Sequence, residues 1–288
     1  MTRRAAAATA ALLALSALTG CSDSTAGLAR PALVLPSPVV EGPAVGPQYV
    51  ALGDSYAAAP GVPETSGVDG CFRSSGNYAQ RLAAATGLTV TDVTCSGATS
   101  ADVLERQVPA ITPEAELVTV GIGGNDFDLF ATLVQSCLSA PPPESDPSGT
   151  PCTDAVGPTV DEVLPRTAQA VQELFAAIDE AAPGARVVVV GYPYLLPDSG
   201  TCPELVPLAA GDYPLVNEAT RRLSGVLRDA AAQQGFDFVD VQGPSRGHDI
   251  CSDEPWINGQ QVAEDGTIPF HPFAAEQQAV AELVASVL

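Results

Sequence analysis

Ser55 is the residue of this chain whose surroundings best suit a nucleophile. It lies in the stretch Tyr49 to Tyr56, Tyr-Val-Ala-Leu-Gly-Asp-Ser-Tyr, which is apolar up to Leu52 and then breaks at Gly-Asp-Ser. An apolar strand followed by helix-favouring alanines places the serine at a strand-to-helix corner, where first-turn N–H groups are open to a negative charge. In an α/β sheet such corners face the crevice that binds ligands. Because ordinary β-turns also favour these residues, a base and an oxyanion site must be sought elsewhere in the chain.

Two other strand ends offer hydrogen-bond donors. Gly97 follows a strand expected over residues 88–93, and Asn125 follows one expected over residues 116–122. Residues at the carboxyl ends of neighbouring parallel strands converge on one crevice. A hydroxyl, an open backbone N–H and a side-chain amide around one point would suit acyl transfer, which needs a nucleophile and donors for the oxygen that becomes negative.

The general base has two candidates, because the chain contains only two histidines, His248 and His271. His271 stands in Pro-Phe-His-Pro just before the last expected helix, in a loop that can return to the strand ends. The neighbour of His248 is Cys251, which suggests a loop tied by a disulfide. We therefore expect His271 to be the base.

The elements that must position these residues alternate along the chain. The patterns predict strands over residues 49–52, 88–93, 116–122, 187–190 and 236–241, and helices over residues 77–86, 100–107, 165–182, 217–234 and 274–288. Such alternation predicts an α/β fold in which a parallel sheet of about five strands has helices on both faces. Residues 136–157 are rich in Pro and Ser and contain two cysteines, which predicts a surface loop stapled by a disulfide.

Length and charge limit the classes of function. The 288 residues suffice for one α/β domain with an exported tail. The formal net charge of −22 comes from 34 acids against 12 bases, all of them arginine. This excess of acid excludes nucleic acid as a partner and disfavours anionic lipid surfaces unless a covalent anchor holds the protein there.

The N-terminus predicts a bacterial lipoprotein signal peptide over residues 1–20. Arg3 and Arg4 precede a short Ala/Leu-rich run that ends in Leu-Thr-Gly-Cys, which resembles the lipobox whose cysteine is lipidated. Cys21 would then anchor the protein to the outer face of the cell membrane; an ordinary cleaved signal, and secretion, is the alternative. Residues 21–47 predict a flexible tether and residues 48–288 the folded domain.

The other six cysteines predict three disulfides, because exported proteins usually pair an even set. Among the possible pairings, the sequential one closes the shortest loops. It joins Cys71 to Cys95, Cys137 to Cys152 and Cys202 to Cys251. No two cysteines are close enough in the sequence to indicate a metal site.

Four blocks resemble those of the GDSL-type SGNH hydrolases, in the order of that family: Gly53-Asp54-Ser55-Tyr56, Cys95-Ser96-Gly97-Ala98-Thr99, Gly123-Gly124-Asn125-Asp126 and His271-Pro272. The match spans residues 48–288 and is most similar to secreted actinobacterial esterases and lipases, which also have six cysteines paired in sequence. The resemblance implies a three-layer, flavodoxin-like fold and a Ser55 nucleophile with His271 as base. It also implies an oxyanion hole built from the N–H groups of Ser55 and Gly97 and the Asn125 amide.

One position departs from the family pattern. Many members have Asp three residues before the histidine, where this chain has Ile268. We expect a Ser-His dyad in which the Ile268 main-chain carbonyl orients the imidazole without supplying charge. Asp265, on a Glu-Asp-Gly turn, is the alternative orienting group.

The expected activity is hydrolysis of carboxylic (acyl) esters or lipids through an acyl-enzyme on Ser55. The expected protein is a monomer, acts on a small-molecule or lipid ester, and needs no metal or cofactor. A thioesterase or lysophospholipase would use the same machinery. A solute-binding lipoprotein would share the anchor and an α/β body, but it would have no reason to place Ser, Gly, Asn and His at these positions.

Overall fold

A five-stranded parallel sheet carries the residues singled out above. The computed structural model describes residues 48–141 and 145–288; the expected signal peptide, Cys21 and the tether lie outside the described residues. The sheet has the order β4-β1-β5-β6-β7, with the strands β1 (Gln48–Gly53), β4 (Thr89–Asp92), β5 (Ala115–Gly121), β6 (Arg186–Val190) and β7 (Asp237–Val239). The expected α/β fold is confirmed.

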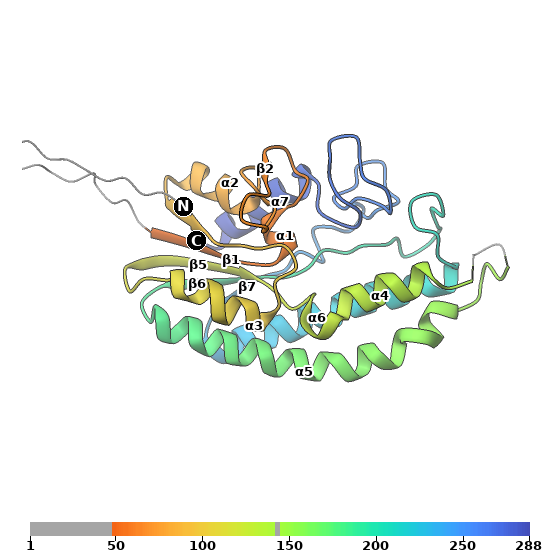
Figure 1. Ribbon diagram of the computed structural model, residues 1–288, viewed down its shortest axis with the longest axis horizontal. Coiled ribbons are helices and arrows are strands. Elements are labelled where there is room, and N and C mark those ends of the chain that lie inside the picture. Colours follow the sequence, from red (N-terminus) through yellow and green to blue (C-terminus); the bar gives the residue numbers. More distant parts are fainter. Residues whose placement is uncertain (1–47, 142–144) are drawn as a thin grey trace, which may run out of the picture. The chain divides into compact units, whose positions relative to one another are not determined.

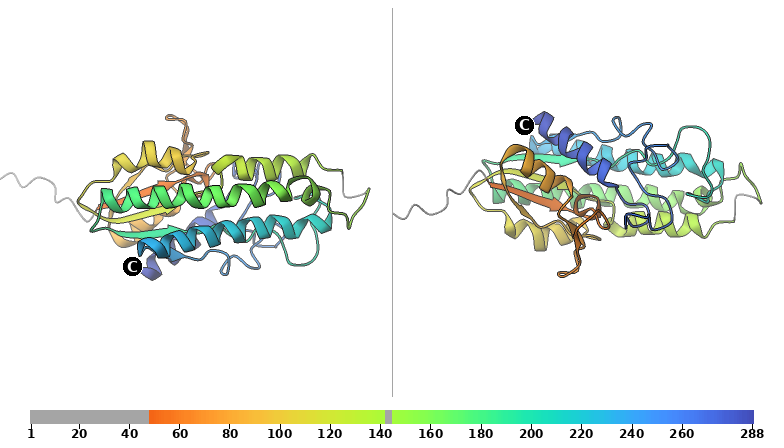
Figure 2. Two further views of the ribbon diagram at one scale, coloured as in Figure 1. Left: turned by 90° about the horizontal axis from the view of Figure 1, so that it is seen from below. Right: turned by 90° about the horizontal axis from the view of Figure 1, so that it is seen from above.

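Helices cover both faces of this sheet (Figures 1 and 2). One face carries α2 (Tyr78–Thr86) and α7 (Ala274–Val287), and the other carries α3 (Ser100–Asp102), α5 (Pro151–Ala181) and α6 (Tyr213–Gln234). Along β1, Tyr49 and Ala51 pack toward the first face, whereas Val50 and Leu52 pack toward the second. Because both faces are buried, the central strands are continuously apolar instead of alternating.

The segment over residues 136–157, expected as a stapled surface loop, is helical at both ends, so that prediction was wrong in its extent. Helix α4 (Leu129–Leu138) has no counterpart among the expected elements, and α5 begins at Pro151, well before the expected start at Pro165. The inward-facing residues of α5 recur at helical spacing, as at Cys152, Val156 and Val160. Packing against α4 and α6 therefore sustains a helix through two prolines that would weaken it in isolation.

Short elements complete the described chain: α1 (Ser55–Ala58), the antiparallel pair β2 (Thr65–Ser66) and β3 (Arg73–Ser74), a π-helical turn η1 (Val103–Gln107), and the 3₁₀ turns η2 (Val108–Ala110), η3 (Asp126–Asp128) and η4 (Ala210–Asp212). Within the two described ranges, no helix has both the length and the apolar character needed to cross a membrane.

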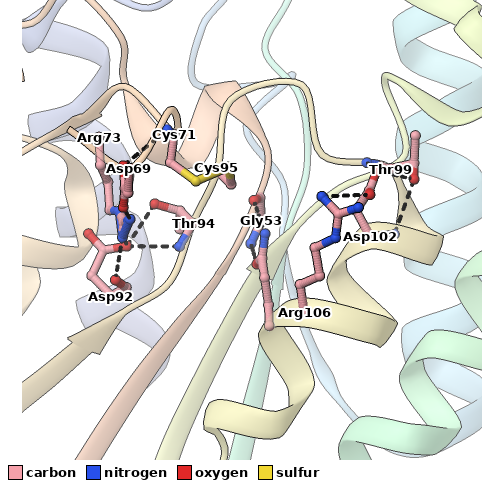
Figure 3. Close-up of a disulfide and its surroundings, with 11 residues drawn as sticks. Gly53, Asp69, Cys71, Arg73, Asp92, Thr94, Cys95, Thr99, Asp102 and Arg106 are labelled. Atoms are coloured by element: carbon pink, nitrogen blue, oxygen red, sulfur yellow. Dashed lines mark hydrogen bonds and ion pairs between the residues drawn. A yellow bond between two sulfur atoms is a disulfide. The ribbon is translucent and has the colours of Figure 1, made fainter. Parts of the chain in front are cut away.

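The three sequential disulfides are confirmed: Cys71–Cys95, Cys137–Cys152 and Cys202–Cys251. Figure 3 shows the first of them, which joins the turn between β2 and β3 to the segment after β4. Arg73 strengthens this junction, because its guanidinium donates to the Asp92 carbonyl at 2.7 Å and pairs with Asp69. The disulfide thus holds the loop that carries Gly97 near the strand-to-helix corner at Ser55, which is called the nucleophile corner below.

Candidate active site

Three adjacent strand ends meet at one edge of the sheet. β1 lies between β4 and β5, so that Ser55, Gly97 and Asn125 follow neighbouring strands. The chain passes from β1 to β4 on one side and then crosses to β5 on the other, which makes β1 the point where the strand order reverses. Ligands of open α/β sheets bind at such a point. The structure therefore brings these three predicted residues to the same edge.

The backbone before Ser55 is tightly held. Gly53 donates its N–H to Gln107 Oε1 at 2.8 Å and accepts from Gln107 Nε2 at 3.0 Å, while the Asp54 N–H donates to the Gly121 carbonyl at 3.1 Å. Gly53 has φ of 143°, and a Cβ at this residue would lie 2.5 Å from the Gly121 oxygen. Only glycine fits there, so β1 can end in this sharp corner and present Ser55.

Ser55 and Gly97 have unused hydrogen-bonding groups at this edge. Among the described residues, the Ser55 hydroxyl has no hydrogen-bond partner, and neither backbone N–H has an acceptor. Gly97 has φ of 82°, and a Cβ there would meet nothing within 4 Å. Because α1 is a single turn, its macrodipole contributes little, and the two N–H groups themselves are what a developing negative charge would meet.

The Asn125 side chain lies beside the Gly97 loop, since its Nδ2 donates to the Ala98 carbonyl at 3.0 Å. An amide nitrogen has a second N–H, which stays available. Asp126 joins the same two loops, because its carboxylate accepts from the backbone N–H and the hydroxyl of Ser100, both at 2.6 Å. Burial raises the pKa of Asp126.

His271 is oriented by a main-chain carbonyl, but not by the expected one. Its Nδ1 lies 2.7 Å from the Pro269 carbonyl oxygen. The Ile268 carbonyl instead accepts from the His271 backbone N–H at 3.3 Å and from Asn258 Nδ2 at 3.2 Å, so its assignment as the orienting group was wrong. Asp265 accepts from the Thr267 N–H at 3.0 Å and closes its own turn.

This contact decides the tautomer of the imidazole. A carbonyl oxygen only accepts, so Nδ1 carries the proton and Nε2 is left as the basic nitrogen. Burial lowers the pKa of His271, while the hydrogen bond to Pro269 opposes the shift. The ring is therefore neutral near pH 7, as a general base requires.

A hydrogen bond and a ring contact join the His271 loop to Tyr56, the residue after Ser55. Tyr56 donates its hydroxyl to the Phe270 carbonyl at 2.9 Å, and the Tyr56 and His271 ring centroids are 5.8 Å apart. His248 is engaged elsewhere: its ring stacks on Trp256 at 4.8 Å, and its Nδ1 lies 2.8 Å from the Glu254 carbonyl. Of the two histidines, His271 is the one beside the nucleophile corner.

An apolar cavity opens beside this corner. Tyr56 and Phe270, the neighbours of Ser55 and His271, line one part of it. One side of α4 lines another with Phe130, Leu133, Val134, Cys137 and Leu138, and the remaining wall comes from Leu195, Leu196, Val206, Leu208, Val216, Ile250 and Ile257. The site thus combines a polar edge with an apolar cavity, an arrangement that suits transfer of an apolar acyl group.

The sequence reasoning missed several of these residues. Gln107 acts through hydrogen bonds to a residue far away in the chain, and Pro269 acts within a folded loop, so no local pattern marks them. The cavity residues of α4 did carry a signal, because Phe130, Val134 and Leu138 recur at a spacing of one helical turn.

Comparison with known proteins shows the family to which this chain belongs. The model of the GDSL-like Lipase/Acylhydrolase family matches residues 51–279. Lipase 2 of Streptomyces coelicolor is 36% identical over 303 residues, covering 99% of this chain and 97% of that protein. A lipase of Streptomyces rimosus is 32% identical over 264 residues, covering 89% of this chain and 93% of that protein.

Two crystal structures are also similar. Phospholipase A1 from Streptomyces albidoflavus NA297 has a TM-score of 0.74 and 31% identity, over 84% of this chain and 99% of that one. The extracellular lipase from Streptomyces rimosus has a TM-score of 0.74 and 30% identity, over 84% of this chain and 100% of that one. This chain therefore belongs to the GDSL-like lipase/acylhydrolase family and is a serine ester hydrolase.

Proposed function

We propose that this protein hydrolyses esters of apolar acyl groups through a Ser55–His271 dyad. His271 Nε2 takes the proton of the Ser55 hydroxyl as its oxygen attacks the ester carbonyl. The alcohol leaves with that proton, and water then releases the acyl group from Ser55 by the same steps in reverse. The Pro269 carbonyl keeps the imidazole in the required tautomer throughout.

The oxyanion of each tetrahedral intermediate would be bound by the Ser55 and Gly97 N–H groups and the Asn125 amide. The observation that supports this proposal is that Ser55 and Gly97 follow neighbouring strand ends, where the Ser55 hydroxyl has no partner and the two backbone N–H groups have no acceptor among the described residues. Donors that are already oriented before the reaction stabilise the developing charge without further reorganisation.

The apolar cavity supports an acyl chain as the part of the substrate that is recognised. Its walls, from Phe130 to Leu138 on one side and Leu195 to Ile257 on the other, offer almost no polar group. Burial of each methylene group stabilises a bound chain by about 0.8 kcal/mol. Lipid esters therefore fit better than short polar esters.

The test is a comparison of Ser55→Ala, Asn125→Ala and the unchanged enzyme on one soluble nitrophenyl ester. Ser55→Ala should abolish turnover and labelling by a fluorophosphonate while the circular dichroism spectrum stays the same. Asn125→Ala should lose about a hundredfold to a thousandfold in kcat, as for one oxyanion donor. Turnover that persists in Ser55→Ala would disprove the mechanism.

We also propose export with a lipid anchor at Cys21, supported by the basic, apolar and Leu-Thr-Gly-Cys segments of residues 1–21. Metabolic labelling with a fatty acid should mark the unchanged protein and leave Cys21→Ser unlabelled. If both appear unlabelled in the medium, the segment is an ordinary secretory signal and the anchor is refuted.

A further inference from the structure

We propose that Tyr192 is a positioning residue whose hydroxyl fixes the nucleophile corner and the Asn125 loop in position relative to each other. The inference rests on the proposed function, because it concerns the same oxyanion site. Tyr192 follows β6, a strand that contributes none of the residues assigned above to the reaction. Tyr192 is 2% exposed, so almost none of its surface is open to a substrate.

The hydroxyl of Tyr192 joins the two sides of the site. It donates to Asp54 Oδ2 and accepts from the Gly124 N–H at 2.9 Å. Asp54 directly precedes Ser55, and Gly124 directly precedes Asn125. A single oxygen therefore links the two residues that immediately precede Ser55 and Asn125, which carry two of the three proposed oxyanion donors.

The second oxygen of Asp54 extends this link around the serine. Asp54 Oδ1 accepts from the Tyr56 N–H at 2.9 Å, so the carboxylate spans Ser55 from one side to the other. Loss of the tyrosine hydroxyl would leave this buried carboxylate with one donor in place of two. The Ser55 N–H would then be less well oriented.

Close packing keeps the tyrosine in place. The rings of Tyr56 and Phe130 meet the Tyr192 ring edge-on, with centroids 5.1 and 5.2 Å away. A Cβ on Gly124 would lie 2.9 Å from the Tyr192 hydroxyl and 2.5 Å from the Phe130 ring. A side chain at position 124 would therefore displace the Phe130 ring and the Tyr192 hydroxyl from this arrangement.

The ionisation of Asp54 provides a readout that would stay the same if Tyr192 had a purely structural role. Burial raises the pKa of Asp54 to about 7, the hydrogen bonds from Tyr192 and Tyr56 oppose this shift, and Asp126 adds to it. Among the described residues no arginine forms an ion pair with Asp54. Removing the Tyr192 donor disfavours the ionised form and raises the pKa of Asp54 further.

The experiment compares Tyr192→Phe with Tyr49→Phe. Tyr49 is a matched control, because it is also fully buried and its hydroxyl lies 2.7 Å from Thr119 Oγ1, a residue within β5 and not at a strand end. Both variants are assayed for kcat and KM on a soluble ester from about pH 5 to pH 9. Urea unfolding measures the stability of each.

Tyr192→Phe should lower kcat by about tenfold to a hundredfold, less than loss of a direct donor, with KM changed by less than about twofold. The acid limb of its profile of kcat against pH should move to higher pH. Tyr49→Phe should keep the kcat and the pH profile of the unchanged enzyme. Asp54→Asn should remove the part of the acid limb near pH 7. An unchanged kcat and acid limb in Tyr192→Phe, or equal losses in Tyr49→Phe, would overturn the inference; turnover by Ser55→Ala would instead refute the proposed function.

Discussion

At the residue scale, the proposed base is oriented by a peptide group and not by a carboxylate. The Pro269 carbonyl fixes the His271 ring but carries no full charge, so it raises the basicity of the imidazole less than an aspartate would. The carboxylate of Asp265, the alternative orienting group, accepts a hydrogen bond from the Thr267 N–H. If the active site is a Ser55–His271 dyad, catalysis should therefore not depend on Asp265.

Replacement of Asp265 by alanine should reduce kcat by less than about tenfold, compared with the roughly ten-thousandfold loss when a triad carboxylate is neutralised. His271→Ala should be nearly inactive, because it removes the base itself. Both variants are assayed on the same soluble ester as the unchanged enzyme. Comparable losses in the two would restore a triad and refute the dyad.

Glu276 is a further buried acid close to the site, and it influences stability. It is 3% exposed, its carboxylate accepts from Gln277 Nε2 at 2.7 Å, and burial raises its pKa to about 8. The same Gln277 nitrogen donates to the Tyr56 carbonyl at 2.9 Å. Ionisation of Glu276 therefore places an uncompensated charge next to the serine corner.

Stability should fall as the pH rises from about 4.5 to about 8, because over that range the folded state keeps the Glu276 proton that the unfolded chain has lost. Glu276→Gln should flatten this dependence and be more stable than the unchanged enzyme above about pH 8. Urea unfolding at several pH values measures the effect. Glu282→Gln, on the exposed side of α7, is the control; an identical pH dependence in all three proteins would contradict the prediction.

At the scale of elements, α4 forms one wall of the apolar cavity proposed to bind the acyl chain. Phe130, Val134 and Leu138 lie one turn apart on the same side of this helix and all line the cavity. At 1.5 Å per residue they span about 12 Å, roughly the length of an extended chain of ten carbons. Val134, halfway along, is thus where added bulk would shorten the cavity.

Val134→Trp should lower kcat/KM for esters of about ten carbons by at least tenfold, since several methylene groups lose their burial. Acetyl and butyryl esters should be hydrolysed almost as before. Gln135→Trp adds the same bulk to the exposed side of α4 and should leave the whole series unchanged. If the chain-length profile of Val134→Trp matches that of Gln135→Trp, the acyl chain binds elsewhere.

At the scale of the whole molecule, three disulfides join segments on which the site depends. The Cys71–Cys95 bridge holds the Gly97 loop, Cys137–Cys152 joins α4 to the start of α5, and Cys202–Cys251 closes the longest loop, with a sequence separation of 49. Such cross-links restrict the unfolded chain, and more so for longer loops.

Reduction of the unfolded protein, followed by refolding under reductant, should lower the free energy of unfolding by several kcal/mol, at about 2 to 4 kcal/mol per bridge. Among single-bridge variants with paired Cys→Ser changes, loss of Cys202–Cys251 should cost more than loss of Cys137–Cys152, whose separation is 15. Urea unfolding of the oxidised, reduced and variant proteins measures this. Equal stability of the oxidised and reduced forms would show that the bridges contribute nothing.

The sequence by itself determined the sheet, the three disulfides and the order of the four blocks around Ser55, Gly97, Asn125 and His271. These features depend on short segments: an apolar run marks a buried strand, and a strand that ends in Gly and polar residues marks its carboxyl end. Because the strand ends of a parallel sheet meet at one edge, local patterns were enough to predict which residues would gather there.

Only the tertiary structure decided the contacts between distant residues. Asp54 and Tyr192 are 138 positions apart and meet because β6 follows β5 in the sheet. The Pro269 carbonyl, and not that of Ile268, faces the His271 ring because Asn258 draws the Ile268 carbonyl away. The free energy of such hydrogen bonds arises only when folding removes both partners from water and places them together, so no short segment records it.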